Sequence, residues 1–210
     1  MEAIVANRWT RLEGDWDYDI LLPLFSFRPE GYFWMPSYRT RHWDGWVSLI
    51  QRYDGGYRVP TGLFLAQQES LNEQFEFQTS YKLEQPKFDL HKLPKFDRPY
   101  QSDCVHSMIT ASRTGGGLVL AGTGTGKTYI AAAFFRAFLG SGCFIVDELT
   151  LQRQTFEELT KVTGESIGII GDSKFSPRRI TVATVQTLAR HARSLRYEKW
   201  SKNLEVVIAD

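Results

Sequence analysis

The pattern of hydrophobic and polar positions changes near residue 98 and divides the chain into two regions. In the first region, short stretches alternate apolar and polar residues between turn residues, as half-buried strands do. In the second region, continuous apolar runs of strand length alternate with segments of helical period. We therefore expect an α/β protein, in which a small α+β domain precedes a domain with a parallel sheet covered on both faces.

The first region covers residues 1–81. Strand-like alternation occurs in four stretches, residues 18–27, 31–36, 46–53 and 57–66. Residues 60–62 break the last of them, and residues 63–75 then have the period of an amphipathic helix. Residues 82–97 carry many charges and two prolines without any period, so we interpret them as a linker.

The second region covers residues 98–210. The apolar runs predict strands at residues 116–122, 142–148, 166–172, 179–185 and 204–210. The segments between them predict helices at residues 98–112, 127–140, 150–162 and 186–200. In the second of these helices, Ile130, Phe134 and Phe138 share one face, which we expect to be buried.

The strongest chemical signal is the sequence AGTGTGKT at residues 121–128, which fits the phosphate-binding loop with Ala121 at its first position. Glycines let the backbone N–H groups wrap closely around phosphates, and the N-terminus of the following helix adds positive potential. The alternative is a glycine-rich turn that fits by chance, but a strand is expected before the loop and a helix after it. The motif predicts binding of ATP with Mg²⁺ through Gly122, Thr123, Gly124, Thr125, Gly126, Lys127 and Thr128.

In such a loop, Lys127 reaches the β- and γ-phosphates, and the Thr128 hydroxyl binds Mg²⁺. A carboxylate at the end of a neighbouring strand completes the metal site. Asp147, followed by Glu148, ends the first strand after the loop, and Asp210 ends the fourth. The loop followed by an acid on the fourth strand resembles the arrangement in superfamily-two motors, so we favour Asp210 as the catalytic and metal-binding acid. The resemblance implies that residues 98–210 are a RecA-like first motor domain cut off at this acid. Asp147 and Glu148 are then an acidic turn at the start of the next helix.

Several segments in series resemble the superfamily-two helicases. Residues 98–101 (RPYQ) resemble their adenine-recognition segment, which implies that Gln101 binds the adenine edge and that Tyr100 or Arg98 packs on the base. Residues 149–154 resemble a DNA-contacting segment and imply roles for Leu151 and Gln154. Residues 182–188 resemble a later one and imply phosphate contacts by Thr184 and Gln186. Capping of a helix by Thr184 is the alternative for that residue.

The aromatic segments of the first region resemble the N-terminal domain of the phage UvsW-type helicases. They include Phe25-Ser26-Phe27, Gly31-Tyr32, Trp43-Asp44-Gly45 and Pro60-Thr61-Gly62-Leu63. The resemblance implies ATP-dependent remodelling of branched DNA, such as forks, Holliday junctions and R-loops. It also implies an N-terminal domain that engages DNA and a second motor domain beyond residue 210, without which we expect residues 1–210 alone to be inactive.

Arginines outnumber acids among the aromatic residues of the first region. Arg39 and Arg41 are therefore candidates for DNA contact, although a solvated arginine face around a tryptophan core is equally compatible with the pattern. The formal net charge of the chain is only +1, so any DNA contact must come from such local clusters.

The remaining features are consistent with a motor in the cytoplasm, or in the host cytoplasm if the protein is viral. Cys104 and Cys143 are too far apart in the sequence for a metal or redox pair, and neither a signal peptide nor a membrane segment is expected. Two alternatives to a helicase stay open. They are a restriction-type DNA translocase, which shares these motifs, and a switch that binds ATP and DNA without moving along it.

Overall fold

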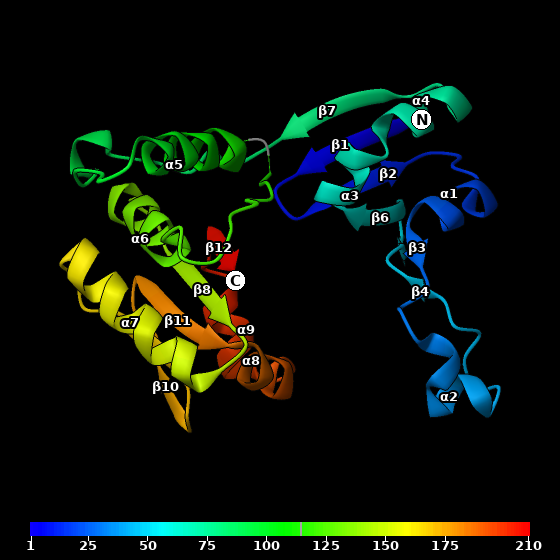
Figure 1. Ribbon diagram of the computed structural model, residues 1–210. Coiled ribbons are helices and arrows are strands. Elements are labelled where there is room, and N and C mark those ends of the chain that lie inside the picture. The colour runs from blue at the N-terminus through cyan, green and yellow to red at the C-terminus, as the bar shows by residue number, and fades with distance from the viewer. Residues whose placement is uncertain (114) are drawn as a thin grey trace. The chain divides into compact units, whose positions relative to one another are not determined.

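The computed structural model describes residues 1–113 and 115–210, and it divides into two compact units (Figure 1). The first unit runs from Met1 to Glu84 and the second from Gln85 to Asp210. Each unit contains a five-stranded sheet and its own cluster of buried apolar side chains. Each therefore has the core that an independent domain requires.

The sheet of the first unit has the strand order β5-β6-β2-β1-β7. Neighbouring strands are antiparallel except β1 and β7, which are parallel. The strands are β1 (Glu2–Ala6), β2 (Trp9–Glu13), β5 (Gln51–Tyr53), β6 (Gly56–Pro60) and β7 (Gln78–Lys82). The sequence pattern did not predict β1, because its three central residues are buried in succession and the strand shows no alternation.

Three helices pack on this sheet, namely α1 (Tyr18–Leu24), α3 (Thr61–Ala66) and α4 (Gln68–Gln74). The prediction of a strand from residue 18 was wrong. The Asp17 side chain accepts a hydrogen bond from the backbone N–H of Asp19 and caps a helix, and Leu21 and Phe25, one helical turn apart, are both buried. The single helix predicted at residues 63–75 is two short helices that meet at Gln67.

A two-stranded ribbon leaves this sheet and carries a small helical tip at its end (Figure 1). The ribbon consists of β3 (Ser26–Phe27) and β4 (Val47–Ser48), and the tip contains a 3₁₀ turn, η1 (Tyr32–Trp34), and α2 (Pro36–Arg39). A strand was predicted at residues 31–36. The chain instead turns at Gly31 and starts a helix at Pro36, where proline suits the first helical position.

The sheet of the second unit has the order β10-β9-β11-β8-β12. Its strands are β8 (Gly142–Val146), β9 (Gly168–Gly171), β10 (Lys174–Ser176), β11 (Ile180–Thr184) and β12 (Val206–Ala209). All pairs are parallel except β9 with β10, a hairpin that the sequence pattern did not predict. With β10 included, β12 is the fifth strand after residues 121–128 rather than the fourth.

Helices cover both faces of this sheet, as the pattern predicted. They are α5 (Pro99–Ser112), α6 (Lys127–Ala137), α7 (Leu149–Thr163), α8 (Val185–His191) and α9 (Leu195–Ser201). In β8, Phe144 and Val146 pack with α5, α6 and α7, whereas Cys143 and Ile145 pack with Leu188 and the aromatic residues of α9 on the opposite face. The predicted helix at residues 186–200 is interrupted at Ser194, whose hydroxyl caps α9.

The buried strand predicted at residues 116–122 is not present. Residues 116–120 belong to no helix or strand, and Leu118 and Leu120 are 85% and 88% exposed. An apolar run of this length indicates a preference for burial but does not supply a neighbouring strand. Among the described strands, β12 is an edge strand bonded to β8 alone, so residues 116–120 have no ladder.

The predicted linker contributes to the core of the second unit. Phe88, Leu93 and Phe96 pack against its buried cluster, and Phe88 forms a β-bridge with Phe138. A short 3₁₀ turn, η2 (Leu90–Lys92), follows. The burial of these three apolar side chains was not predicted, because the segment is rich in prolines and charges and is packed without a regular period.

Candidate nucleotide-binding site

The phosphate-loop motif forms a turn that leads directly into α6. Gly124 and Gly126 have φ angles of 78° and 82°, a left-handed conformation that side chains with a Cβ rarely adopt. Gly126 is the N-cap of α6 and makes no side-chain cap, so the N–H groups of the first turn have no intrahelical acceptor. The free N–H donors and the positive N-terminal end of α6 therefore both lie at the glycine loop.

The interior of the loop is open. A Cβ built at Gly124 would meet nothing within 4 Å, and one at Gly122 would meet only the Thr125 methyl group at 3.8 Å. The Thr125 hydroxyl donates to the carbonyl oxygen of Gly122 at 2.8 Å and fixes the turn. The Lys127 ammonium lies 3.5 Å from the carbonyl oxygen of Ala121, so its charge is held over the loop. Thr123 is exposed and Thr128 is half-buried.

The predicted adenine-recognition segment, residues 98–101, lies against this loop. The Tyr100 hydroxyl donates to the carbonyl oxygen of Thr125 at 2.8 Å, and Nε2 of Gln101 donates to the same oxygen at 3.4 Å. Nη1 of Arg98 in turn donates to the Tyr100 hydroxyl at 3.0 Å. Residues that are more than twenty positions apart in the sequence thus form one cluster at the start of α5 and α6.

Gln101 has an unused acceptor in this cluster. The side chain is only 7% exposed, and its Oε1 atom is buried without a hydrogen-bond partner among the described residues. A buried amide oxygen left unpaired costs about 1–3 kcal/mol. An exocyclic amino group of a purine is a donor of the kind this oxygen lacks, so the cluster fits a nucleotide held by the open glycine loop.

The two candidate acids lie at the same edge of the sheet. Asp210 follows β12 and Asp147 follows β8, and the backbone N–H of Asp210 donates to the carbonyl oxygen of Ile145 at 3.1 Å. Both carboxylates are exposed. Glu148 occupies the N-cap position of α7, as the acidic-turn interpretation expects. The carboxyl ends of parallel strands are where such sheets place ligand chemistry.

The first predicted DNA-contacting segment forms the start of α7. Gln154 is exposed, whereas Leu151 is half-buried against the core. The sequence did not predict a structural role for Gln152, which is 3% exposed. Its Nε2 donates to the carbonyl oxygens of Ile170 at 3.0 Å and Val182 at 3.2 Å, and so ties α7 to β9 and β11. A polar residue near the start of a helix gave no signal for this role.

The second predicted segment connects β11 to α8. Gln186 is exposed and donates through Nε2 to the backbone carbonyl of Asp147, which joins the loops after β11 and β8. Thr184 is only 3% exposed, and its hydroxyl donates to that of Thr187 at 2.8 Å. This burial opposes the predicted phosphate contact. Thr184 occupies the N-cap position of α8 but makes no capping hydrogen bond with its side chain, so the capping alternative is not confirmed either.

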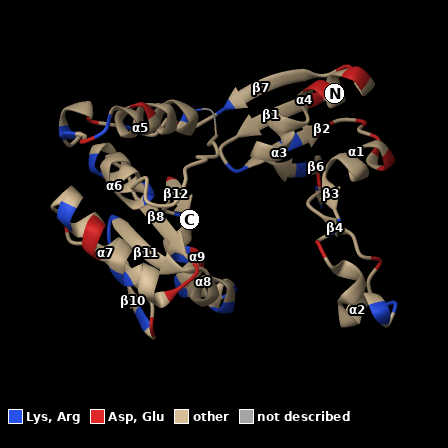
Figure 2. Ribbon diagram, in the orientation of Figure 1, with Lys and Arg blue, Asp and Glu red and all other residues tan. Residues whose placement is uncertain are grey.

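Arg39 and Arg41 are exposed on the helical tip of the first unit, and the ribbon at the end of α2 has the colour of Lys and Arg in Figure 2. Arg41 has a φ angle of 58°, which is uncommon for a residue with a side chain. Their roles in DNA binding stay predictions.

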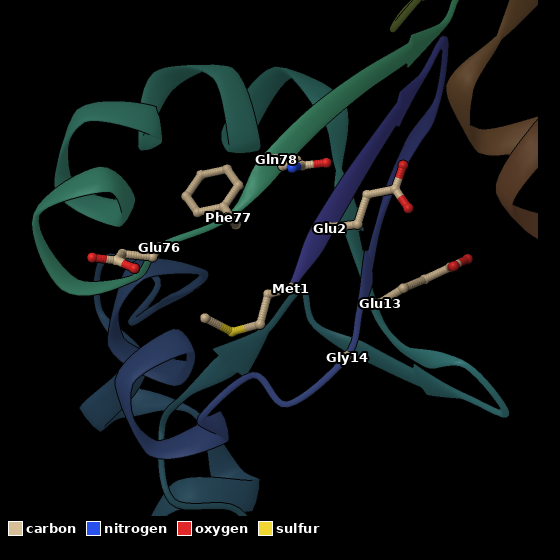
Figure 3. A pocket seen from close by; sticks show the side chains of 7 residues that line it. All are labelled: Met1, Glu2, Glu13, Gly14, Glu76, Phe77 and Gln78. Carbon is tan, nitrogen blue, oxygen red and sulfur yellow. The ribbon is translucent and has the colours of Figure 1, made fainter.

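A cavity of about 690 Å³ in the first unit has the opposite character (Figure 3). Glu2, Glu13 and Glu76 surround it, together with Met1. These carboxylates would repel phosphates, and among the described residues there is no group of three or more His, Cys, Asp or Glu that could hold a metal ion. This cavity is therefore not the nucleotide site.

No helix in the part of the chain that the structure describes is long and apolar enough to cross a membrane. A search of curated protein sequences found no match. The crystal structure of the UvsW helicase from bacteriophage T4 is similar to this chain, with a TM-score of 0.70 and 19% sequence identity. The match covers 100% of this chain and 82% of the helicase chain, so the chain has the helicase fold that its motifs implied.

The model of the family described as "Type III restriction enzyme, res subunit" (ResIII) matches residues 95–210. This range is more than half of the chain. It includes the adenine-recognition segment, the glycine loop, both candidate acids and the two predicted DNA-contacting segments of the second unit. The chain therefore belongs to the ResIII family.

Proposed function

We propose that the chain is the ATP-binding part of a DNA helicase that remodels branched DNA such as forks, Holliday junctions and R-loops. The observation that carries this proposal is the contact between the adenine-recognition segment and the glycine loop. Tyr100 and Gln101 both donate to the carbonyl oxygen of Thr125 in that loop. A glycine-rich turn that fitted the motif by chance would have no reason to contact a second nucleotide-binding segment.

The residues of the second unit have distinct roles in this proposal. The loop N–H groups and Lys127 hold the β- and γ-phosphates, and Thr128 with Asp210 holds Mg²⁺, which supplies the charge that stabilises the transferred phosphoryl group. Arg98 and Tyr100 pack on the base, and Gln101 binds its edge. Asp210 lies on the carboxyl edge of the sheet, where the resemblance to superfamily-two helicases expects the metal-binding acid.

DNA contact is proposed at the same edge, through Gln154 and Gln186. The hydrogen bond from Gln186 to the carbonyl of Asp147 supports mechanical coupling, because it joins the loop before α7 to the loop before α8. Closure against a second motor domain would then move both loops together along a strand. The first unit would contact DNA through Arg39 and Arg41.

The proposal is tested with the intact protein, ATP, Mg²⁺ and a fluorescently labelled model fork. We expect strand separation or fork regression that stops in the Lys127→Ala variant. The Lys161→Ala variant is the control, because Lys161 is an exposed lysine in the last turn of α7. Fork remodelling that continued in Lys127→Ala would contradict the proposal.

A second candidate is a restriction-type DNA translocase, which the family match over residues 95–210 favours. The same experiment separates the two when a third strand is annealed to a duplex as a triplex. A translocase displaces the third strand without separating the duplex, whereas a helicase separates the fork. A nucleotide-dependent switch would do neither.

A further inference from the structure

In the helical tip of the first unit, residues 28–46, several aromatic rings pack on one another and on Gly45. Gly45 is buried between two tyrosines, and a Cβ built there would lie 2.6 Å from the ring of Tyr32 and 3.2 Å from that of Tyr38. These two rings meet edge to face with centroids 4.9 Å apart. The Trp43 indole N–H donates to the carbonyl oxygen of Trp46 at 2.6 Å. The tip is therefore a built structure rather than a loose loop.

The same tip exposes several aromatic rings, and two of them are adjacent. Trp34 is 72% exposed and Phe33 is 49% exposed, with ring centroids 5.1 Å apart. Trp16 in the sheet core of the same unit is only 4% exposed, so the unit can bury a tryptophan where its stability requires it. Adjacent exposed rings on an ordered scaffold offer flat apolar faces at little cost in conformational entropy.

The charges around these rings are mainly positive. The tip contains three arginines and two carboxylates. One carboxylate, Asp44, already accepts the backbone N–H of Trp46 at 3.0 Å. Arg28 lies over the rings of Tyr32 and Trp46 at 4.9 Å and 4.8 Å. Arg39 and Arg41 follow the exposed pair by five to eight positions in the sequence. Arg39 is the last residue of α2, whose end is blue in Figure 2, and Arg41 comes two residues later.

Exposed rings and exposed arginines on one small scaffold are the combination with which proteins bind single-stranded nucleic acids, since every base has a face that stacks and every nucleotide has a phosphate. A lipid surface would be met by a longer amphipathic helix, whereas α2 has only four residues. We propose that the tip binds single-stranded DNA by stacking Trp34 and Phe33 on unpaired bases, while Arg39 and Arg41 hold the flanking phosphates. This inference rests on the proposed action on DNA and adds a base-stacking site to it.

The test compares the chain with its Trp34→Ala variant in binding to a labelled fifteen-nucleotide oligothymidylate. We expect about tenfold weaker binding, in the range measured for loss of one stacked base. The effect should disappear on an abasic strand of equal length, where no base can stack. Tyr81→Ala is the matched control, because Tyr81 is a 57% exposed aromatic residue on β7 of the same unit. It should bind as the unaltered chain does.

Salt dependence separates stacking from charge. Arg39→Gln and Arg41→Gln should each reduce the slope of log affinity against log salt by about 0.7. Trp34→Ala should leave that slope unchanged. Circular dichroism should show the same fold for every variant, and Trp34→Phe, which keeps a stacking ring, should retain most of the affinity. A labelled ATP analogue should bind all of them equally, because the nucleotide site is in the other unit.

Several outcomes would overturn the inference. Equal oligothymidylate affinity of Trp34→Ala and the unaltered chain would show that the ring does not stack on a base, and so would an equal loss on the abasic strand. If the Phe33→Ala/Trp34→Ala variant changed only self-association, or only binding to phosphatidylserine vesicles, the tip would be a protein or lipid contact instead. Failure of the unaltered chain to bind any DNA would instead reject the proposed action on DNA itself.

Discussion

Gln101 joins two nucleotide-binding segments through a single side chain. Its Nε2 donates to the carbonyl oxygen of Thr125, while its buried Oε1 has no partner among the described residues. The amide also lies close to the loop, since a Cβ built at Gly126 would approach Nε2 to 3.0 Å. In the proposed function, Gln101 would bind the base through Oε1 and contact the loop through Nε2.

Replacing Gln101 by Ala should weaken the binding of a labelled ATP analogue about tenfold, because one hydrogen bond to the base and one to the loop are lost. The preference for ATP over GTP should fall at the same time, since Oε1 is the acceptor that suits an adenine amino group. Titrations with both nucleotides measure this, and Gln154→Ala serves as the control on an exposed glutamine. Unchanged ATP preference would exclude base recognition by Gln101.

Arg179 holds together three parts of the second unit. Its guanidinium donates to both carboxylate oxygens of Glu165 at 2.7 Å, and its Nη1 donates to the carbonyl oxygens of Phe138 and Gly140 at 2.7 and 3.0 Å. The bonds connect the start of β11 to the segments after α6 and α7. These hydrogen bonds stabilise the fold mainly because the two carbonyl groups would otherwise lack a partner.

The Arg179→Ala variant should lower the free energy of unfolding by about 2–3 kcal/mol, mainly through the two carbonyls left without a donor. Urea denaturation followed by circular dichroism measures it. The neighbouring Arg178 is exposed, so Arg178→Ala should change stability by less than about 0.5 kcal/mol. A loss of equal size in both variants would assign the effect to net charge rather than to these hydrogen bonds.

The two cysteines should differ in reactivity. Burial raises the pKa of the Cys143 thiol to about 12, and it raises the pKa of the partly exposed Cys104 thiol by less. A thiol-specific reagent at pH 8 should therefore label Cys104 first and Cys143 only after unfolding. Since the folded pKa of Cys143 is raised, its contribution to stability is complete below its unfolded pKa and declines as the pH rises towards 12. Cys143 lies on β8, and its side chain is buried against α9. Rapid labelling of Cys143 in the native chain would contradict this burial.

At the scale of elements, helix α3 contains a glycine with no evident structural role. Gly62 is exposed, and a Cβ built there would meet nothing within 4 Å. Glycine inside a helix costs about 0.5–1 kcal/mol relative to alanine. Gly62→Ala should therefore raise the free energy of unfolding of the first unit by up to this amount, as urea titration would show. A destabilised variant would mean that this backbone is not helical.

Helices with one buried face and strands buried on both faces could be predicted from the sequence. The helices α5, α6 and α7 and the strands β8, β9, β11 and β12 followed from period and apolar runs, because the sheet is covered on both faces. Elements that depend on distant partners were not predictable. The strand β1 is flanked by β7 from the end of the unit, and the apolar residues 116–120 have no ladder among the described strands. A local pattern records neither circumstance.

Much of the candidate site could be predicted because its residues lie in short local motifs. The glycine loop and the RPYQ segment are local motifs, and the chemistry of phosphates and bases fixes their residue types. Sequence could not supply the burial of Thr184, the structural role of Gln152, or the exposure of Trp34 on the tip, because each depends on what the fold packs beside it.

At the scale of the whole molecule, the two units divide the proposed work. The second unit holds the glycine loop and both candidate acids, and the first unit carries the aromatic tip. The cavity of the first unit is acidic, which disfavours a phosphate ligand there. The proposed helicase function therefore depends on nucleotide binding by the second unit.

Equilibrium titration of the 210-residue chain with a fluorescent ATP analogue and Mg²⁺ tests this claim most directly. The account predicts saturable binding that weakens at least tenfold in Lys127→Ala, because a charged contact to the phosphates is lost. Lys161→Ala should bind as the unaltered chain does. Binding that is absent in the unaltered chain, or equal in Lys127→Ala, would contradict the account.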